Sequence, residues 1–251
     1  MGLNPSDGNM YDFITHTWNT VKGKCYHDCS YCYMKFLNKN QREEHIDKDE
    51  FKTDLTKDKF IFLGSGIDLF AKNISSDWIK RTLDKCYEAN NNLFGEGNKY
   101  FFQSKNPRRF LEFIHHPVFE DSVICTTIET NRWYEEHMRN SPRIEDRVSA
   151  MEEISMRGIK TYVTAEPLME FDLDEMIECI RRCHPAQVNF GRESFRDVEI
   201  PEPTNNEEVN KLILKVAKFT DKVVIKKNAL LNAGKDITAY YNHELNELIE
   251  L

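Results

Sequence analysis

The sequence predicts an α/β fold, a partial (β/α)6 TIM-like barrel built on an open and mostly parallel sheet. Short apolar runs alternate with helical patterns along the chain, which is typical of βαβ units around a parallel sheet. The number of these runs gives six or seven βα units, and a complete eightfold barrel would need more chain than the 251 residues present.

The predicted strands are short runs rich in β-branched or aromatic residues and bounded by polar residues or glycine. They cover residues 59–63, 100–103, 122–128, 160–164, 186–190 and 222–225. An earlier strand is expected near residues 11–17, ahead of a group of cysteines.

Helical patterns fill the intervals between the strands. Ser76 and Asp77 are suitable caps for a helix over 78–89, and Pro107 suits the first turn of a helix that ends near residue 115. Further helices are expected over 144–157, 173–183, 207–219 and 237–250. We expect a single domain over 1–251, with a core at about 11–226 and a helical extension at about 227–251.

Composition narrows the class of protein. The net charge is −8, which argues against a protein that coats nucleic acid by bulk charge. The N-terminus lacks the apolar core of a signal peptide, and no run approaches the roughly 20 apolar residues that span a membrane. We therefore expect a cytoplasmic protein without a membrane partner. Seven cysteines, an odd number, argue against a disulfide framework and leave thiols free to bind metal.

Three cysteines fall within eight residues, as Cys25, Cys29 and Cys32 in the spacing C-x3-C-x2-C. Structural zinc sites usually have four protein ligands, whereas iron–sulfur clusters are held by cysteine thiolates. Three thiolates leave one iron of a [4Fe–4S] cluster open to a substrate or cofactor. Zinc is the alternative, with remote ligands from Cys179, Cys183 and His184. Otherwise Cys179 and Cys183 are interpreted as helix-face residues.

This motif resembles the signature of the radical S-adenosylmethionine (SAM) superfamily, C-x3-C-x-aromatic-C, with Tyr31 as the aromatic residue. The resemblance implies that the open iron binds SAM and that reductive cleavage yields a 5′-deoxyadenosyl radical, which abstracts hydrogen from a substrate. It also implies a barrel of the radical SAM type, with the cluster loop after the first strand, and a reducing partner such as flavodoxin or ferredoxin.

A closer resemblance concerns motifs further along the chain. Residues 29–33, with Lys105-Asn106-Pro107, resemble the spore photoproduct lyase branch, whose enzyme repairs a thymine photoproduct in DNA. Residues 66–70, 105–107, 128–129 and 166–168 resemble, in that order, the motifs of a small phage-associated radical SAM family without a defined substrate. The lyase-like motifs favour a nucleic-acid base or nucleotide as substrate. A peptide or small metabolite and a non-catalytic zinc-binding protein are the competing hypotheses.

Candidate ligand-binding residues lie where the predicted strands end, because function collects at the carboxyl ends of parallel strands. Gly64, Ser65 and Asp68 follow the second strand, where many radical SAM proteins have a Gly-Gly-Glu that binds the SAM amino group. Asp68 is the candidate for that contact, and a helix cap is its alternative role. Lys105 follows the third strand as a candidate catalytic residue or contact for an anion, with a solvated lysine as the alternative.

The later strands supply the remaining candidates. Alternation places Cys125, Thr127 and Glu129 on one face of the fourth strand. The resemblance implies that Glu129 contacts the SAM ribose, and Cys125 is a candidate hydrogen-atom donor or an inert packed thiol. Glu166 ends the fifth strand. Asn189 and Arg192 lie at the end of the sixth strand and just after it, and both are candidates to bind SAM or substrate. The alternative role for Arg192 is a salt bridge within the loop.

Overall fold

A computed structural model describes residues 2–6, 11–55, 57–91, 97–192, 198–226 and 229, and the backbone of 239–242 and 247–250. Ten strands form one sheet, and its central seven are parallel. In sheet order these are β2 (His16–Trp18), β5 (Phe60–Leu63), β6 (Lys99–Gln103), β7 (Ser122–Thr127), β8 (Lys160–Ala165), β9 (Gln187–Phe190) and β10 (Lys222–Ile225).

Antiparallel strands extend both edges of this sheet. β1 (Asn4–Pro5) pairs with β2, and β11 (Ala239–Asn242) pairs with β10 and with β12 (Glu247–Glu250). The order begins at β1 and ends at β12, so the described strands form an open barrel. A separate two-stranded sheet joins β3 (Val21–Lys22) to β4 (His45–Ile46).

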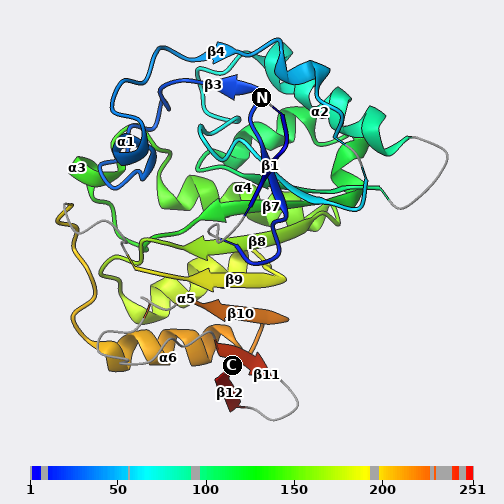
Figure 1. The fold of residues 1–251 in the computed structure, drawn as a ribbon. Helices are drawn as coiled ribbons and strands as arrows, with labels where there is room; N and C mark the ends of the chain where they lie inside the picture. The colour runs from blue at the N-terminus through cyan, green and yellow to red at the C-terminus, as the bar shows by residue number, and fades with distance from the viewer. Residues whose placement is uncertain are drawn as a thin grey trace.

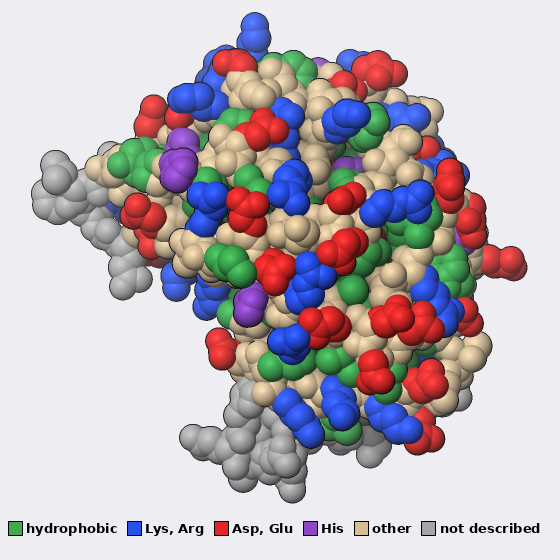
Figure 2. Space-filling model, turned by 180° about the vertical axis from the view of Figure 1, so that it is seen from behind, with side chains coloured by type: hydrophobic (Ala, Val, Ile, Leu, Met, Phe, Trp, Pro, Cys, Tyr) green, Lys and Arg blue, Asp and Glu red, His purple; other side chains and the backbone are tan. Residues whose placement is uncertain are grey.

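Helices cover one face of the sheet. The long ones are α2 (Ser76–Asn90), α4 (Ile144–Met156), α5 (Leu173–Arg182) and α6 (Asn206–Val216). Short ones are α1 (Met34–Leu37), α3 (Glu135–Met138) and the 3-10 helices η1 (Glu50–Lys52), η2 (Pro107–Phe113) and η3 (Pro117–Asp121). No helix in the described part of the chain is long and apolar enough to cross a membrane. Seen from behind, the described acidic and basic side chains are interspersed rather than gathered by sign (Figure 2).

Side chains alternate between two cores along each strand. On β6, Tyr100 and Phe102 pack toward the helices, whereas Phe101 packs into a second cluster inside the open barrel. On β7, Val123 and Cys125 belong to that interior cluster and Ile124 belongs to the helix side. The interior cluster fills the barrel on the side away from the carboxyl ends of the strands. Those ends therefore remain free for a binding site.

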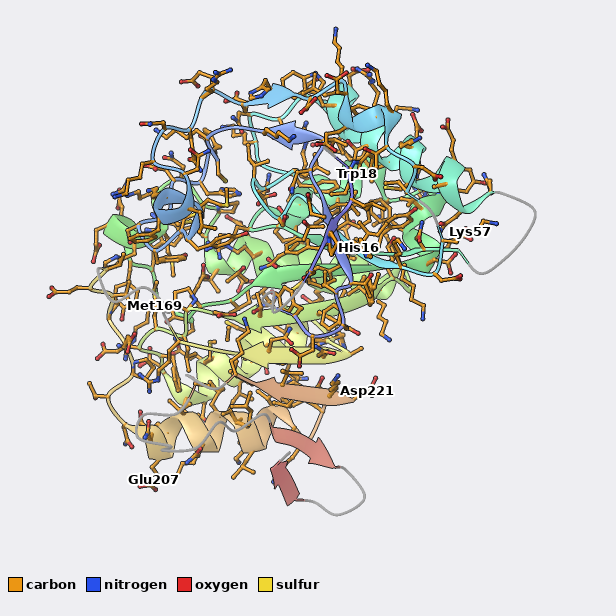
Figure 3. All side chains as sticks on the ribbon, viewed as in Figure 1. His16, Trp18, Lys57, Met169, Glu207 and Asp221 are labelled. Carbon is orange, nitrogen blue, oxygen red and sulfur yellow. The ribbon has the colours of Figure 1, made fainter. Side chains whose placement is uncertain are left out.

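The carboxyl ends of the parallel strands lie on one side of the molecule. β7, β8 and β9 point toward the side that carries α1 and α3 (Figure 1). Met169, shortly after β8, lies on that side, and Asp221, just before β10, lies on the opposite one (Figure 3). The site predicted at the strand ends therefore belongs to the side of α1 and α3.

The predicted strands from residue 59 to residue 225 are confirmed, while four other elements differ from expectation, the last of them toward the C-terminus. β2 begins at His16, because Tyr11 and Ile14 turn into the interior aromatic cluster instead of extending a strand. Ser75 caps α2, so the cap lies one residue before the expected pair and the helix already begins at Ser76. The segment after Pro107 forms the 3-10 helix η2.

The expected helix over 237–250 is wrong where the structure describes it. Residues 239–242 and 247–250 are strands β11 and β12, and 243–246 lie outside the described residues. The pairs Tyr240-Tyr241 and Leu248-Ile249 favour strands, and the edge of β10 offers unpaired backbone groups to receive them.

Candidate functional site

The three motif cysteines lie on the loop between β3 and α1 and line one cavity of about 900 Å³. Residues from the ends of β5, β6, β7, β8, β9 and β10 line the same cavity. Cys29 is buried, whereas Cys25 and Cys32 are partly exposed. The cysteine loop and the strand ends therefore face one space.

Residues 137–141, at the end of α3 and just after it, clamp the cysteine loop. Ser30 N donates to His137 O at 3.0 Å, and Asn140 Nδ2 donates to Tyr26 O at 2.9 Å. Arg139 pairs with Asp28, whose φ of 52° lies in the left-handed region. Cys29 Sγ lies 3.3 Å from Ser141 Oγ. These contacts fix the loop before any cofactor binds, and the sequence analysis did not identify them.

Gly23 allows the cysteine loop to begin. Its φ is +118°, and a Cβ there would lie 2.5 Å from Glu43 O. We expect Gly23→Ala to destabilise the protein well beyond the roughly 1–2 kcal/mol of a left-handed alanine, because a backbone atom must also move. Gly158→Ala is the matched control, since its φ is +80° and nothing lies within 4 Å of its Cβ position. Urea denaturation of both variants tests this, and equal losses of unfolding free energy would contradict it.

The thiols of the loop form a donor set that suits an iron–sulfur cluster. Cys25 and Cys32 each interact electrostatically with Cys29. Burial, aided by the Asp68 carboxylate, raises the pKa of the Cys25 thiol to about 12, and burial also raises the pKa of Cys32. Bound iron would supply the positive charge that thiolates need in such a site. Three thiols from one clamped loop therefore fit a cluster that lacks a fourth protein ligand.

The remote zinc ligands do not reach this loop. Cys183 is buried between α5 and the sheet, and Cys179 borders a separate surface hollow with Glu145 and Glu178. His184, which follows them, is exposed and also lies outside the lining of the cavity. Among the described residues, the motif cysteines included, no three His, Cys, Asp or Glu side chains are arranged to hold a single metal ion. In a [4Fe–4S] cluster each thiolate binds a different iron, so the motif thiols need not converge on one ion.

Glu129 is the centre of a buried charge network rather than a free strand-end carboxylate. Lys105 Nζ lies 2.5 Å from Glu129 Oε1, and Arg147 Nη1 lies 2.8 Å from Oε2. Tyr31, the aromatic residue of the motif, donates its hydroxyl to Glu129 Oε1 at 2.5 Å. Lys105 Nζ also lies 4.3 Å from the centroid of the Tyr31 ring. The network ties the cysteine loop to β6, β7 and α4.

The position of Glu129 corrects the prediction that it shares a face with Cys125 and Thr127. β7 ends at Thr127, where the chain turns, and Glu129 is fully buried against Arg147. Thr127 lines the cavity and accepts a hydrogen bond from Gln103 at 3.2 Å. Cys125 is fully buried in the interior cluster with Tyr11, outside the cavity lining. The structure therefore does not bring the Cys125 thiol to the cavity.

Because Glu129 is a buried, paired carboxylate, we expect the protein to lose stability as the pH falls. Burial alone would raise its pKa, but Arg147 and Lys105 lower the pKa of Glu129 to about 2. Its folded pKa lies below the usual value near 4.5, so its contribution is complete above that value and is lost as the pH falls toward 2. We expect on the order of 3 kcal/mol of stability to disappear over this range. Denaturation at pH 6, 4 and 3 measures how the unfolding free energy changes with pH. The same pH dependence in Glu129→Gln would contradict the assignment of this loss to Glu129.

Asp68 joins the cysteine loop to two strand ends. Its Oδ2 accepts hydrogen bonds from His27 Nε2 at 2.7 Å, Ser104 Oγ at 2.9 Å and the backbone N of Lys105 at 2.9 Å. Its Oδ1 accepts from Phe70 N at 2.9 Å. Although burial opposes ionisation, His27 and these donors lower the pKa of Asp68. Asp68 is thus an anion that holds the loop in place.

Gly64 and Ser65 form the turn after β5. A Cβ at Gly64, whose φ is +76°, would lie 2.9 Å from Ile67 O. Ser65 Oγ accepts from Asn19 Nδ2 at 3.0 Å, and Tyr33 donates its hydroxyl to Ser65 O. Both turn residues line the same cavity as the cysteines.

The far wall of the cavity comes from β8, β9 and β10. Glu166 forms an ion pair with Lys226, and burial raises the pKa of Glu166. Asn189 accepts from Gln187 at 2.7 Å. Arg192 lines the cavity, but its guanidinium donates to Ala229 O and Pro203 O, each at 2.9 Å. Arg192 Nη1 also lies 3.2 Å from Glu202 Oε2, so Arg192 forms the salt bridge that was its alternative role, besides holding neighbouring backbone.

Several residues of the site were not predicted from the sequence: His27, Tyr11, Arg147, Lys226 and the clamp at 137–141. Of these, His27 lies between two motif cysteines, which was a usable signal. Arg147 lies in the middle of α4 and Lys226 follows β10 without a motif, so only the tertiary structure identifies them.

Comparison with known proteins identifies the fold. No protein-family model matches the sequence, and no curated protein matches it. The structure resembles a double mutant of spore photoproduct lyase with bound AdoMet and dinucleoside spore photoproduct, with a TM-score of 0.58 and 10% identity over 85% of this chain. It also resembles the lyase complexed with dinucleoside spore photoproduct, with a TM-score of 0.58 and 10% identity over 94% of this chain.

The shared part is smaller than the lyase. The chain spans 64% of the first of these structures and 68% of the second. At 10% identity the likeness concerns the fold, and it confirms the predicted partial barrel, which the chain shares with spore photoproduct lyase.

Proposed function

We propose that this chain is a radical SAM enzyme that holds a [4Fe–4S] cluster on Cys25, Cys29 and Cys32 and binds SAM in the adjoining cavity. The observation that carries the proposal is the position of the cysteine loop. Three thiols from one clamped loop line a cavity of about 900 Å³ at the carboxyl ends of parallel strands. The fold is shared with spore photoproduct lyase, one structure of which has bound AdoMet.

A cluster held by Cys25, Cys29 and Cys32 would supply the one electron that cleaves SAM to methionine and a 5′-deoxyadenosyl radical able to abstract hydrogen from the substrate. The chain's own residues prepare the site for this chemistry. The clamp at 137–141 and the Asp68–His27 hydrogen bond fix the loop that carries the thiolates. Lys105, held over Tyr31 and beside Glu129, keeps positive charge close to Cys29. A preorganised site of this kind needs little rearrangement when its ligands bind.

The size and lining of the cavity support a second ligand beside SAM. Its volume lies toward the upper end of the roughly 300–1,000 Å³ typical of small-molecule sites. Gln103, Thr127, Gln187 and Asn189 supply neutral donors and acceptors on its inner wall. These groups suit a polar heterocycle, and we propose a nucleic-acid base or nucleotide as substrate. A reducing protein such as flavodoxin or ferredoxin would supply the electron.

Metal analysis and spectroscopy after anaerobic iron–sulfide reconstitution test the cofactor. We expect about four irons per chain, a brown protein and an EPR signal that appears on reduction with dithionite. A colourless protein with one stoichiometric zinc would overturn the proposal and favour a zinc-stabilised binding protein. Stimulation of SAM cleavage by nucleotides or DNA, compared with peptides, then separates the two substrate classes.

A further inference from the structure

The three candidate carboxylates at the strand ends differ in what they offer a ligand. Both oxygens of Asp68 and both oxygens of Glu129 accept hydrogen bonds from protein groups. Glu166 differs, because Lys226 donates to its Oε2 while Oε1 has no hydrogen-bond partner among the described residues. Glu166 lines the cavity and its side chain is 15% exposed. Among the three, Glu166 can bind a ligand without breaking a contact within the protein.

Lys226 also keeps hydrogen-bonding capacity. An ammonium group has three donors, and its side-chain hydrogen bond within the described residues goes to Glu166. Its Nζ lies 5.4 Å from the centroid of the Tyr11 ring, and its side chain is 20% exposed. The pair thus presents an acceptor beside a donor on the cavity wall.

Gly191 leaves the space that this pair occupies. A Cβ at position 191 would lie 2.9 Å from Glu166 Cδ and 3.1 Å from Lys226 Cδ. The backbone of Gly191 is fixed by hydrogen bonds to Ala165 O and from Leu168 N. The absence of a side chain here serves the placement of the ion pair, which is therefore a built feature of the wall.

The pair lies away from the cysteines. Glu166 follows β8 and Lys226 follows β10, whereas the cysteine loop follows β2 and β3 near the other edge of the parallel strands. Asp68 and Lys105 interact electrostatically with the motif thiols, whereas Glu166 forms its ion pair with Lys226. The pair therefore faces the part of the cavity opposite the cluster site.

We propose that Glu166 and Lys226 determine substrate specificity by binding an edge on which an N–H lies beside a C=O, as in the imide edge of a pyrimidine. The inference rests on the proposed function and assigns the pair to the substrate instead of to SAM. Glu166 Oε1 accepts the N–H, and Lys226 Nζ donates to the carbonyl oxygen. A ligand that lacks the N–H leaves a buried carboxylate oxygen unpaired, and such sites discriminate strongly.

Thymidine and N3-methylthymidine test this assignment, because the methyl group removes the N–H and keeps both carbonyls. The reconstituted protein with SAM bound is titrated with each nucleoside by calorimetry. We expect the wild type to prefer thymidine by at least about tenfold. We expect Glu166→Met to reduce this preference to within about twofold. We expect Lys226→Met to weaken the binding of both nucleosides equally. Lys211→Met, on an exposed ion pair of α6, is the control for surface charge.

The Glu166→Met/Lys226→Met double variant removes both charges and guards against misfolding caused by one unpaired ion. It is expected to bind both nucleosides weakly and alike. Equal affinities for the two nucleosides in the wild type, or no thymidine binding at millimolar concentration, would overturn the inference. So would an equal loss of SAM affinity in the variants, which would assign the pair to SAM. Failure of the proposed function would appear separately, as a wild-type protein without an iron–sulfur cluster.

Discussion

Arg147→Met is expected to destabilise the protein by about 3–5 kcal/mol, the cost of breaking a buried ion pair from one side. Arg147 is fully buried, and its Nη1 donates to Glu129 Oε2 and to Thr127 O. Its Nε donates to Pro142 O at 2.9 Å. Without the guanidinium, Glu129 keeps its ion pair with Lys105 but loses its ion pair with the fully buried Arg147. Urea denaturation of the cluster-free protein measures the change in unfolding free energy.

An exposed arginine provides the control for this variant. Arg108 lies 3.3 Å from Glu153, and both side chains are well exposed, so Arg108→Met is expected to cost less than about 1 kcal/mol. Replacing Glu129 and Arg147 together with methionine should recover part of the loss, because no buried carboxylate then lacks its partner. An Arg147→Met protein as stable as Arg108→Met would refute the role of this network.

Cys32→Ala is expected to abolish cluster binding and to lower the formation of 5′-deoxyadenosine from SAM by more than about 100-fold. The loss of an outer partner of a metal ligand typically costs about 10- to 100-fold, and loss of a ligand should exceed that. Cys179→Ala is the matched control, since Cys179 is also partly exposed but lies outside the cavity. Iron content and SAM cleavage measure the effect. Equal iron content in the two variants would contradict the assignment of Cys32.

Much of the fold could be predicted from local sequence. The runs at 59–63 and 160–164 are short, apolar and bounded by polar residues, and the parallel pairing of each with its neighbours follows from the helices that connect successive strands. The hydrophobic pattern did not show where the N-terminal strand begins. Tyr11 and Ile14 look like strand residues, but their side chains fill the barrel interior. An apolar side chain has the same local signature in either place.

The candidate site divides in the same way. The cysteines could be predicted because their function depends on spacing within one loop. The roles of Glu129 and Glu166 could not, because an acidic residue at a strand end looks alike whether an arginine buries it or a cavity exposes it. Arg147 on α4 and Lys226 after β10 decide that difference, and both reach their carboxylates only through the tertiary fold. Buried charge networks of this kind have no local pattern.

The most direct test of the account is the amount of 5′-deoxyadenosine formed from SAM by the anaerobically reconstituted, dithionite-reduced wild-type protein. The account predicts 5′-deoxyadenosine that depends on the reductant and on Cys25, Cys29 and Cys32. A protein that carries a full iron–sulfur cluster, binds SAM and yet forms no 5′-deoxyadenosine, with or without nucleotides, would contradict it.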